Sequence, residues 1–158
     1  MYINREHRDG FNGKMIWRIK VDLPDVKSFD EELYRYEKLE RTKILLEGYW
    51  RGRRFFVGKN RFCEPVAYVE MLKTDAYYGC DGGYDYSGKP YWLPKEEQEE
   101  ESWYIGFDHG HAGDYDPYNA VNYGDDTGYK WPLTEMLMEI SELICEIERD
   151  NEIMEDDD

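Results

Sequence analysis

The sequence predicts an α+β fold, in which a small, mainly antiparallel sheet of four to six strands packs against two amphipathic helices. Polar and apolar residues alternate over 17–23, as they do in a strand with one buried side. Near the C-terminus, apolar residues recur at helical spacing, at Met136, Ile140, Leu143, Ile144 and Ile147. Each pattern leaves an apolar side that must be buried against another element, and a sheet covered by helices achieves this.

The first strand should end at Pro24, because proline cannot donate to a strand ladder. Ser28 and Glu31 have the spacing of a capping box, which predicts the first helix over about 29–47. Gly48 is a plausible stop for this helix. Its apolar face would consist of Phe29, Leu33, Tyr36 and Leu39.

Three further segments have strand character. Residues 49–60 are rich in aromatic and basic side chains and predict a strand or hairpin, with turns at Gly52 and Gly58. Residues 66–72 and 103–107 are rich in β-branched and aromatic side chains, which favour strands.

The remaining segments are less regular. Gly, Asp and Tyr dominate 77–88, which predicts a loop or a short strand. The glutamates of 95–101 predict a solvated connector between strands, and 108–131 predicts a long irregular segment. Pro132 can open the second helix, which we expect over about 132–149.

The length of 158 residues fits one domain, which we place at residues 1–150, followed by a disordered acidic tail at 151–158. No apolar run approaches the roughly 20 residues of a membrane span, and the N-terminus lacks the apolar segment of a secretory signal. We therefore expect a cytoplasmic protein that does not bind membranes. The three cysteines form no C-x-x-C pair, and Cys145 is expected to be buried on the apolar face of the last helix.

Charge is divided unevenly along the chain. Residues 1–63 contain 15 Lys and Arg against 10 Asp and Glu, whereas residues 64–158 contain 5 against 26. With a net charge of −16, the molecule should repel long nucleic acid and attract basic surfaces. The simpler alternative is that acidity only keeps the protein soluble. The expected partner-binding residues are Glu96, Glu97, Glu99, Glu100 and Glu101.

A candidate ligand site follows the predicted strand at 103–107. Asp108, His111 and Asp114 are spaced three residues apart, and imidazole and carboxylate groups together suit Zn, Mn or Fe. The spacing matches no metallohydrolase motif, so hydrogen bonds that hold the loop are the first interpretation, a ligand or partner site the second and a metal the third. Tyr86 and Ser87 complete the candidate site. We expect no cofactor.

The aromatic and basic segment offers a candidate anion site at Arg51, Arg53 and Arg54. Guanidinium groups beside aromatic rings can bind a nucleotide or single-stranded nucleic acid. The alternative, which we favour, is a surface on which these arginines pair with glutamates of neighbouring strands over aromatic side chains.

The segments Gly82-Gly83-Tyr84-Asp85-Tyr86-Ser87-Gly88 and Gly106-Phe107-Asp108-His109-Gly110-His111-Ala112-Gly113-Asp114 together resemble a family of small, uncharacterised phage and prophage proteins. In that family a Gly-Gly-x-x-x-Ser-Gly segment leads to a strand that reads Gly-Phe-Asp-x-x-His-x-Gly-Asp, and a C-terminal helix follows. Members often carry His before the paired glycines, where this chain has Asp81. The resemblance implies a phage accessory gene that acts in a bacterial host cell, and it implies no reaction.

These observations predict a phage-encoded binding protein rather than an enzyme. Its acidic surface would block a bacterial defence or nucleic-acid-handling protein with a basic surface, because opposite charge speeds encounter. The alternative function is binding or hydrolysis of a nucleotide-like small molecule at the Asp/His site, with or without a metal. The sequence leaves the oligomeric state open.

Overall fold

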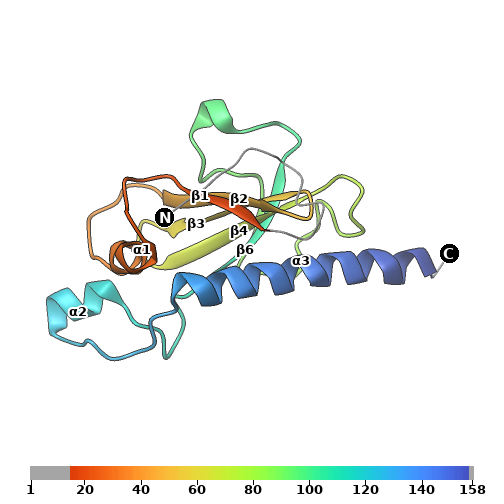
Figure 1. Ribbon diagram of the computed structural model, residues 1–158. Coiled ribbons are helices and arrows are strands. Elements are labelled where there is room, and N and C mark those ends of the chain that lie inside the picture. The colour runs from red at the N-terminus through yellow and green to blue at the C-terminus, as the bar shows by residue number, and fades with distance from the viewer. Residues whose placement is uncertain (1–14, 157–158) are drawn as a thin grey trace.

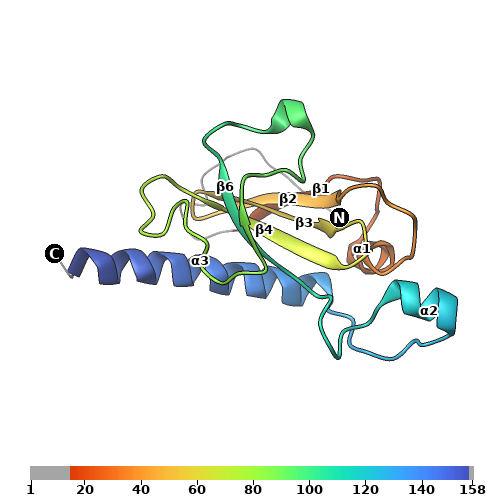
Figure 2. The same ribbon diagram turned by 180° about the vertical axis from the view of Figure 1, so that it is seen from behind.

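A sheet of six antiparallel strands forms the centre of the part of the chain, residues 15–156, that the computed structural model describes. The strands lie in the order β1-β2-β3-β4-β6-β5, and the long helix α3 runs beneath the sheet (Figures 1 and 2). The strands are β1 (Ile16–Ile19), β2 (Lys43–Trp50), β3 (Arg53–Lys59), β4 (Pro65–Met71), β5 (Tyr86–Gly88) and β6 (Trp103–Asp108). The helices are α1 (Val26–Leu33), α2 (Pro117–Tyr123), α3 (Leu133–Asp156) and the short 3-10 helix η1 (Lys95–Glu97). The α+β prediction is confirmed, with α1 and α3 as the helices that cover one face of the sheet.

Both faces of the sheet are buried. On one face, Phe55, Val57 and Val69 pack against the apolar sides of α1 and α3. On the other, Tyr68 stacks on Trp92 with the ring centroids 4.0 Å apart and the ring planes 6° from parallel. Trp92 belongs to the segment between β5 and β6, which arches over this second face (Figure 1). Because both faces are covered, β3 and β4 are buried at almost every position rather than at alternate ones, and β4 is apolar everywhere except at Glu70.

The helix predicted over 29–47 is wrong beyond Leu33, and only its first residues are helical. It begins earlier, because the Asp25 side chain accepts a hydrogen bond from the Ser28 N–H, and α1 ends at Leu33. The Lys59 ammonium group, fully buried on β3, donates to the carbonyl oxygens of Glu32 and Arg35 at 2.8 Å each. A tertiary contact thus caps the end of α1, and residues 43–50 form strand β2 instead.

The segment 49–60, predicted to be a strand or hairpin, contains the end of β2, the turn and the whole of β3. Arg51 and Gly52 connect them with φ angles of 52° and 80°, the two positive values that a type I′ turn requires. Gly58 does not form a turn. It lies within β3, where a Cβ atom would be 2.2 Å from the carbonyl oxygen of Lys43, beside an irregularity in the β2–β3 register. The strands predicted at 66–72 and 103–107 are confirmed as β4 and β6.

The last helix is longer than the 132–149 predicted, since α3 continues to Asp156. Asn151 explains part of this extension, because its side chain donates to the Asp75 carboxylate and accepts from the Ala76 N–H. Residues 151–156 are therefore helical, in place of the start of the disordered tail that we expected, and the last two residues lie outside those described. Cys145 is exposed, which corrects the expectation that it is buried.

The segment 108–131 contains structure that the sequence did not predict. Asp116 caps α2 by accepting hydrogen bonds from the N–H groups of Tyr118 and Asn119, and Gly124 ends this helix in the left-handed conformation. Among the described residues, no helix has the length and apolar composition needed to cross a membrane.

Candidate functional site

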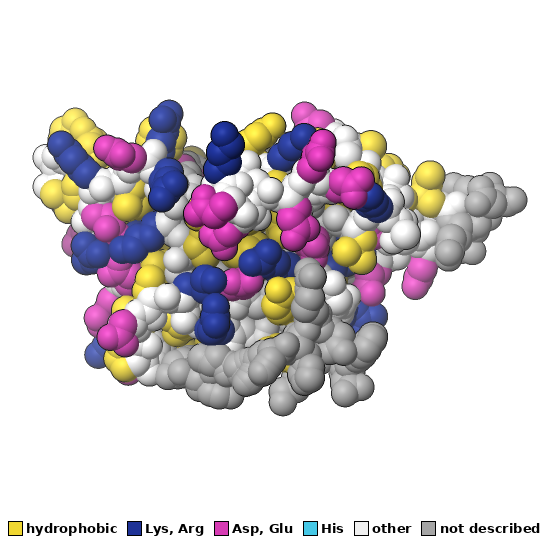
Figure 3. All heavy atoms as spheres, turned by 90° about the horizontal axis from the view of Figure 1, so that it is seen from above, with side chains coloured by type: hydrophobic (Ala, Val, Ile, Leu, Met, Phe, Trp, Pro, Cys, Tyr) yellow, Lys and Arg dark blue, Asp and Glu magenta, His cyan; other side chains and the backbone are white. Residues whose placement is uncertain are grey.

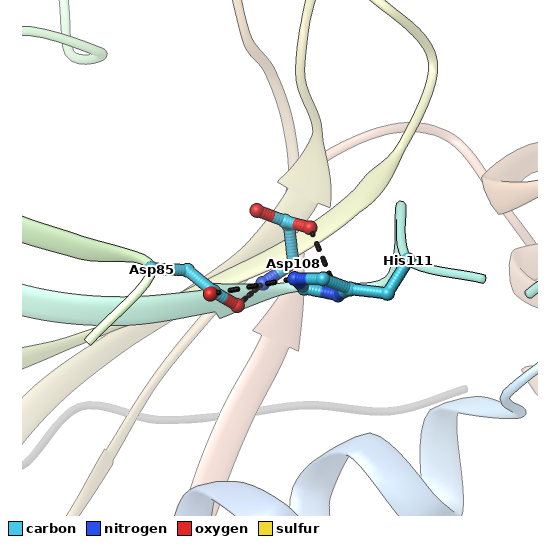
Figure 4. A group of neighbouring side chains, drawn as sticks. All are labelled: Asp85, Asp108 and His111. Atoms are coloured by element: carbon cyan, nitrogen blue, oxygen red, sulfur yellow. Dashed lines mark hydrogen bonds and ion pairs between the residues drawn. The ribbon is translucent and has the colours of Figure 1, made fainter. Parts of the chain in front are cut away.

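At the end of strand β6, three side chains lie close together that can bind a metal ion or transfer a proton. Asp108 is the last residue of β6, and the antiparallel neighbour β5 places Asp85 beside it, with the Asp108 N–H donating to Asp85 Oδ2 at 3.1 Å. His111 then turns back so that its ring lies between the two carboxylates (Figure 4). We call Asp85, Asp108 and His111 the Asp–His cluster.

The imidazole ring of His111 faces one carboxylate with each nitrogen. Nε2 lies 3.5 Å from Asp85 Oδ1, and Nδ1 lies 3.5 Å from Asp108 Oδ1. These separations are too long for good hydrogen bonds. One ligand atom of each residue lies within 4.8 Å of the others, so a small inward movement would let them share one cation. His111 is 59% exposed, which leaves the cluster open to solvent.

Asp114 does not belong to this cluster. Its Oδ2 accepts a hydrogen bond from the His111 N–H at 3.1 Å, and its Oδ1 accepts one from the indole Nε1 of Trp131 at 3.0 Å. Both oxygens of Asp114 therefore hold the loop together.

Tyr86 and Ser87 also point elsewhere. The Ser87 hydroxyl donates to the Cys80 carbonyl at 2.8 Å and accepts from Trp103 Nε1 at 3.2 Å. The Tyr86 ring packs edge-on against Tyr68 on the second face of the sheet. These two residues position β5, while the neighbouring Asp85, which the sequence did not single out, contributes its carboxylate to the Asp–His cluster.

A groove runs between the loop before β5 and helix α3, with a volume of about 350 Å³. Its charged walls are Asp85, Glu139, Glu142 and Glu146. Its apolar lining consists of Tyr84, Phe107 and Leu143. We call this feature the acidic groove, and it meets the Asp–His cluster at Asp85, which belongs to both.

The electrostatics of the acidic groove act on its tyrosine. Burial raises the pKa of Tyr84 above its usual value, and the carboxylates of Glu146 and Asp150 raise it further. Glu139 lies 3.0 Å from Nε2 of the buried His109, a residue that the sequence analysis passed over. Within residues 15–154, Glu142 and Glu146 contact no Lys or Arg at ion-pair distance.

The three arginines of the candidate anion site, Arg51, Arg53 and Arg54, each pair with a carboxylate. Arg53 forms a buried bidentate pair with Asp75, with both N···O distances 2.6 Å. Arg51 pairs with Glu148 at 2.6 Å, and Arg54 pairs with Glu47 at 2.6 Å while its guanidinium lies over the Phe56 ring. The favoured alternative, arginines paired with carboxylates over aromatic side chains, describes what the structure contains.

The predicted partner-binding glutamates lie on the opposite side of the sheet from α3. Glu96, Glu97, Glu99, Glu100 and Glu101 are all exposed on the arch between β5 and β6 (Figure 1). Glu101 pairs with Lys73. Figure 3 looks onto this side and shows Lys and Arg side chains interspersed with the Asp and Glu side chains. The arch is therefore acidic in sequence but lies on a face of mixed charge.

Comparison of the chain with protein-family models, with curated proteins and with solved structures finds no match. The resemblance to phage proteins therefore stays an expectation, and the function must be inferred from the geometry of the sites.

Proposed function

We propose that this chain is a binding protein that docks onto a basic protein surface through the acidic groove. The single observation that carries the proposal is the groove itself, in which four carboxylates surround an apolar lining between α3 and the loop before β5. Charge at the rim and apolar contact at the centre are the usual composition of a protein interface.

The pairing of charges supports this choice of surface. Several basic residues of the first part of the chain pair with acids of the same part, as Lys43 and Lys59 do with Glu32 and Glu37. Among the described residues of α3, Glu148 pairs with Arg51, whereas Glu142 and Glu146 of the groove have no Lys or Arg at ion-pair distance. The groove thus concentrates the negative charge that the composition gives to residues 64–158.

A partner of matching chemistry is a segment rich in Arg and Lys, such as the cleft of a nucleic-acid-binding protein. In the form that the sequence led us to expect, the partner is a defence or nucleic-acid-handling protein of a bacterial host, and occupation of its cleft blocks its function.

The chemistry of the groove is tested with a fluorescent oligo-arginine peptide, whose binding is followed by anisotropy. The double variant Glu142→Gln, Glu146→Gln should weaken binding about fivefold or more and should slow association, because exposed charges act mainly on the encounter rate. The matched control Glu96→Gln, Glu97→Gln makes the same change in net charge on the arch and should have less than about a twofold effect. Equal effects of the two variants would show that only net charge matters and would overturn the proposal.

The biological form of the proposal has its own experiment. Expression of the chain in bacteria that carry a defence system should raise the plating efficiency of a sensitive phage. The groove variant should lose this effect, whereas the arch variant should retain it. No change in plating with any defended strain would count against an anti-defence role while leaving the peptide result intact.

The Asp–His cluster favours a second candidate function, the binding of a divalent metal ion. Two carboxylates and an imidazole are ligands for Mn, Fe or Zn, and backbone N–H groups of Asp108 and Gly110 already orient the two carboxylates. A bound metal would supply a Lewis acid at a solvent-open position, where a phosphate-bearing small molecule can reach it.

Calorimetry with Mn²⁺ and with Zn²⁺ on chelator-treated protein tests this second candidate. Asp85→Asn and His111→Ala should each remove binding, whereas Asp81→Asn, an exposed aspartate four residues from Asp85, should leave it unchanged. Binding that survives both cluster variants would place the metal elsewhere.

A further inference from the structure

A second pocket lies at the end of the molecule where three segments meet. Its lining comes from the connection between α1 and β2, from the turn between β3 and β4, and from the start of α2, and these segments lie at the same end in Figures 1 and 2. Its volume is about 660 Å³, within the range of small-molecule sites. We call it the aromatic pocket. It shares no residue with the acidic groove or the Asp–His cluster.

The walls of the aromatic pocket present large rings to solvent. Phe62 is 60% exposed and Tyr118 is 46% exposed, and Tyr36 meets Tyr118 edge-on with the ring centroids 5.9 Å apart. Exposed rings gathered around one cavity are costly to hydrate, and they provide faces on which a planar group can stack.

The exposure of Phe62 follows from a well-defined turn. The Asn60 side chain accepts hydrogen bonds from the N–H groups of Phe62 and Glu64, and Cys63 adopts a φ of 61°. Cys63 is buried, with its thiol donating to the Glu37 carbonyl at 3.0 Å. Cys63 thus anchors the turn inward, and Phe62 is held at its surface.

The charges that line the aromatic pocket are not equally free. Four carboxylates line it, those of Glu37, Glu40, Glu64 and Asp116. Glu37 lies 2.6 Å from the Lys59 ammonium group, Glu64 accepts a hydrogen bond from the Asn60 side chain at 2.9 Å, and Asp116 caps α2, whereas Glu40 is exposed. In the part of the chain that the structure describes, Lys38 and Arg61 contact no carboxylate at ion-pair distance, and the Arg61 guanidinium lies 4.9 Å above the Phe62 ring. The uncommitted cations therefore lie beside the exposed rings.

We infer that the aromatic pocket binds a small aromatic anion of the nucleotide class. A base stacks on Phe62 or Tyr118, and the phosphate is bound by Arg61 and Lys38. A guanidinium fork matches a phosphate in geometry, and stacking accepts any base. This inference does not rest on the proposed protein-binding function.

Calorimetry with AMP, adenosine and ribose 5-phosphate as probes tests this inference. AMP should bind more tightly than either fragment, because only AMP contacts both the rings and the cations. Phe62→Ala should weaken AMP binding about tenfold, the scale of one lost stacking contact. Arg61→Ala should reduce AMP binding to the level of adenosine.

Two matched variants control for general surface effects. Tyr91 is 72% exposed on the arch, and Tyr91→Ala should leave AMP binding unchanged. Lys89→Ala removes an exposed cation outside the pocket and should also have no effect. The inference is overturned if AMP does not bind at millimolar concentration, if Phe62→Ala binds AMP like the wild type, or if the pocket binds choline more tightly than AMP.

Discussion

Arg53 and Asp75 join strand β3 to the loop after β4 through two parallel hydrogen bonds, each 2.6 Å long, with both side chains buried. Asp75 also accepts from Asn151 on α3 and from the Leu72 N–H, so this carboxylate links the sheet, a loop and the last helix. Burial opposes ionisation of Asp75, but the hydrogen bonds from Arg53, Asn151 and Leu72 outweigh it and lower the pKa of the carboxyl group.

Breaking this pair should strongly destabilise the fold. We expect Arg53→Ala to lower the free energy of unfolding by about 3–5 kcal/mol, because it leaves the Asp75 carboxylate buried without its charged partner. The control is Arg51→Ala, which removes a solvent-exposed pair with Glu148 and should cost less than about 1 kcal/mol. Urea denaturation of both variants measures the difference. Similar losses in the two variants would contradict the importance of burial.

Acid should destabilise the protein through Glu32. Hydrogen bonds from Arg35 lower the pKa of Glu32 from 4.5 to about 2, against the opposing effect of burial and with help from Lys43 and Lys59. Because the folded-state pKa lies below the unfolded one, this stabilisation is complete above pH 4.5 and is lost as the pH falls toward about 2. The free energy of unfolding, measured by urea denaturation over this pH range, should depend less steeply on pH for Glu32→Gln than for the wild type. The neighbouring Glu31→Gln should keep the wild-type slope.

Substitutions of Asp114 and His111 should distinguish a residue that stabilises the loop from a residue that belongs to the candidate site. Asp114→Ala leaves the His111 N–H and the Trp131 indole N–H without their acceptor, at roughly 1–3 kcal/mol for each group that stays buried. His111→Ala removes a largely exposed ring and should cost less than about 1 kcal/mol. Thermal melting compares the two variants. A larger loss for His111→Ala would make the Asp–His cluster a structural feature.

Thiol accessibility provides a check on the packing. Cys80 and Cys145 are exposed, so both should react with a thiol reagent in the native protein. Cys63 is buried and should react only after unfolding. The double variant Cys80→Ser, Cys145→Ser keeps Cys63 as the one remaining thiol, so its labelling can be followed separately. Fast labelling of Cys63 in the native state would contradict the anchored turn that exposes Phe62.

Strands β1, β3, β4 and β6 and the last helix could be predicted because their signals are local. Strand β4 is rich in β-branched and aromatic residues, and α3 repeats its apolar positions at helical spacing over several turns. The first helix was predicted too long because its end depends on Lys59, which comes from β3 and contacts carbonyl groups far away in sequence. No local pattern encodes that contact.

The candidate sites show the same difference between local sequence signals and contacts between residues that are distant in sequence. Asp108 and His111 could be found because they lie in one short segment, and the structure brings them together. Asp85 was missed as a ligand because its position depends on the register of β5 against β6. The acids of α3 could not be singled out from the sequence, because the loop that forms a groove with them comes from elsewhere in the chain.

The burial of both sheet faces has a consequence for how this protein can change over time. In most two-layer folds every second residue of a central strand is free to vary, but in β3 and β4 nearly every side chain is enclosed. We therefore expect selection for stability to remove most substitutions in these strands. Variation will accumulate instead at the margins, where the groove, the cluster and the pocket are located, so new binding preferences can arise without any cost to the scaffold that carries them.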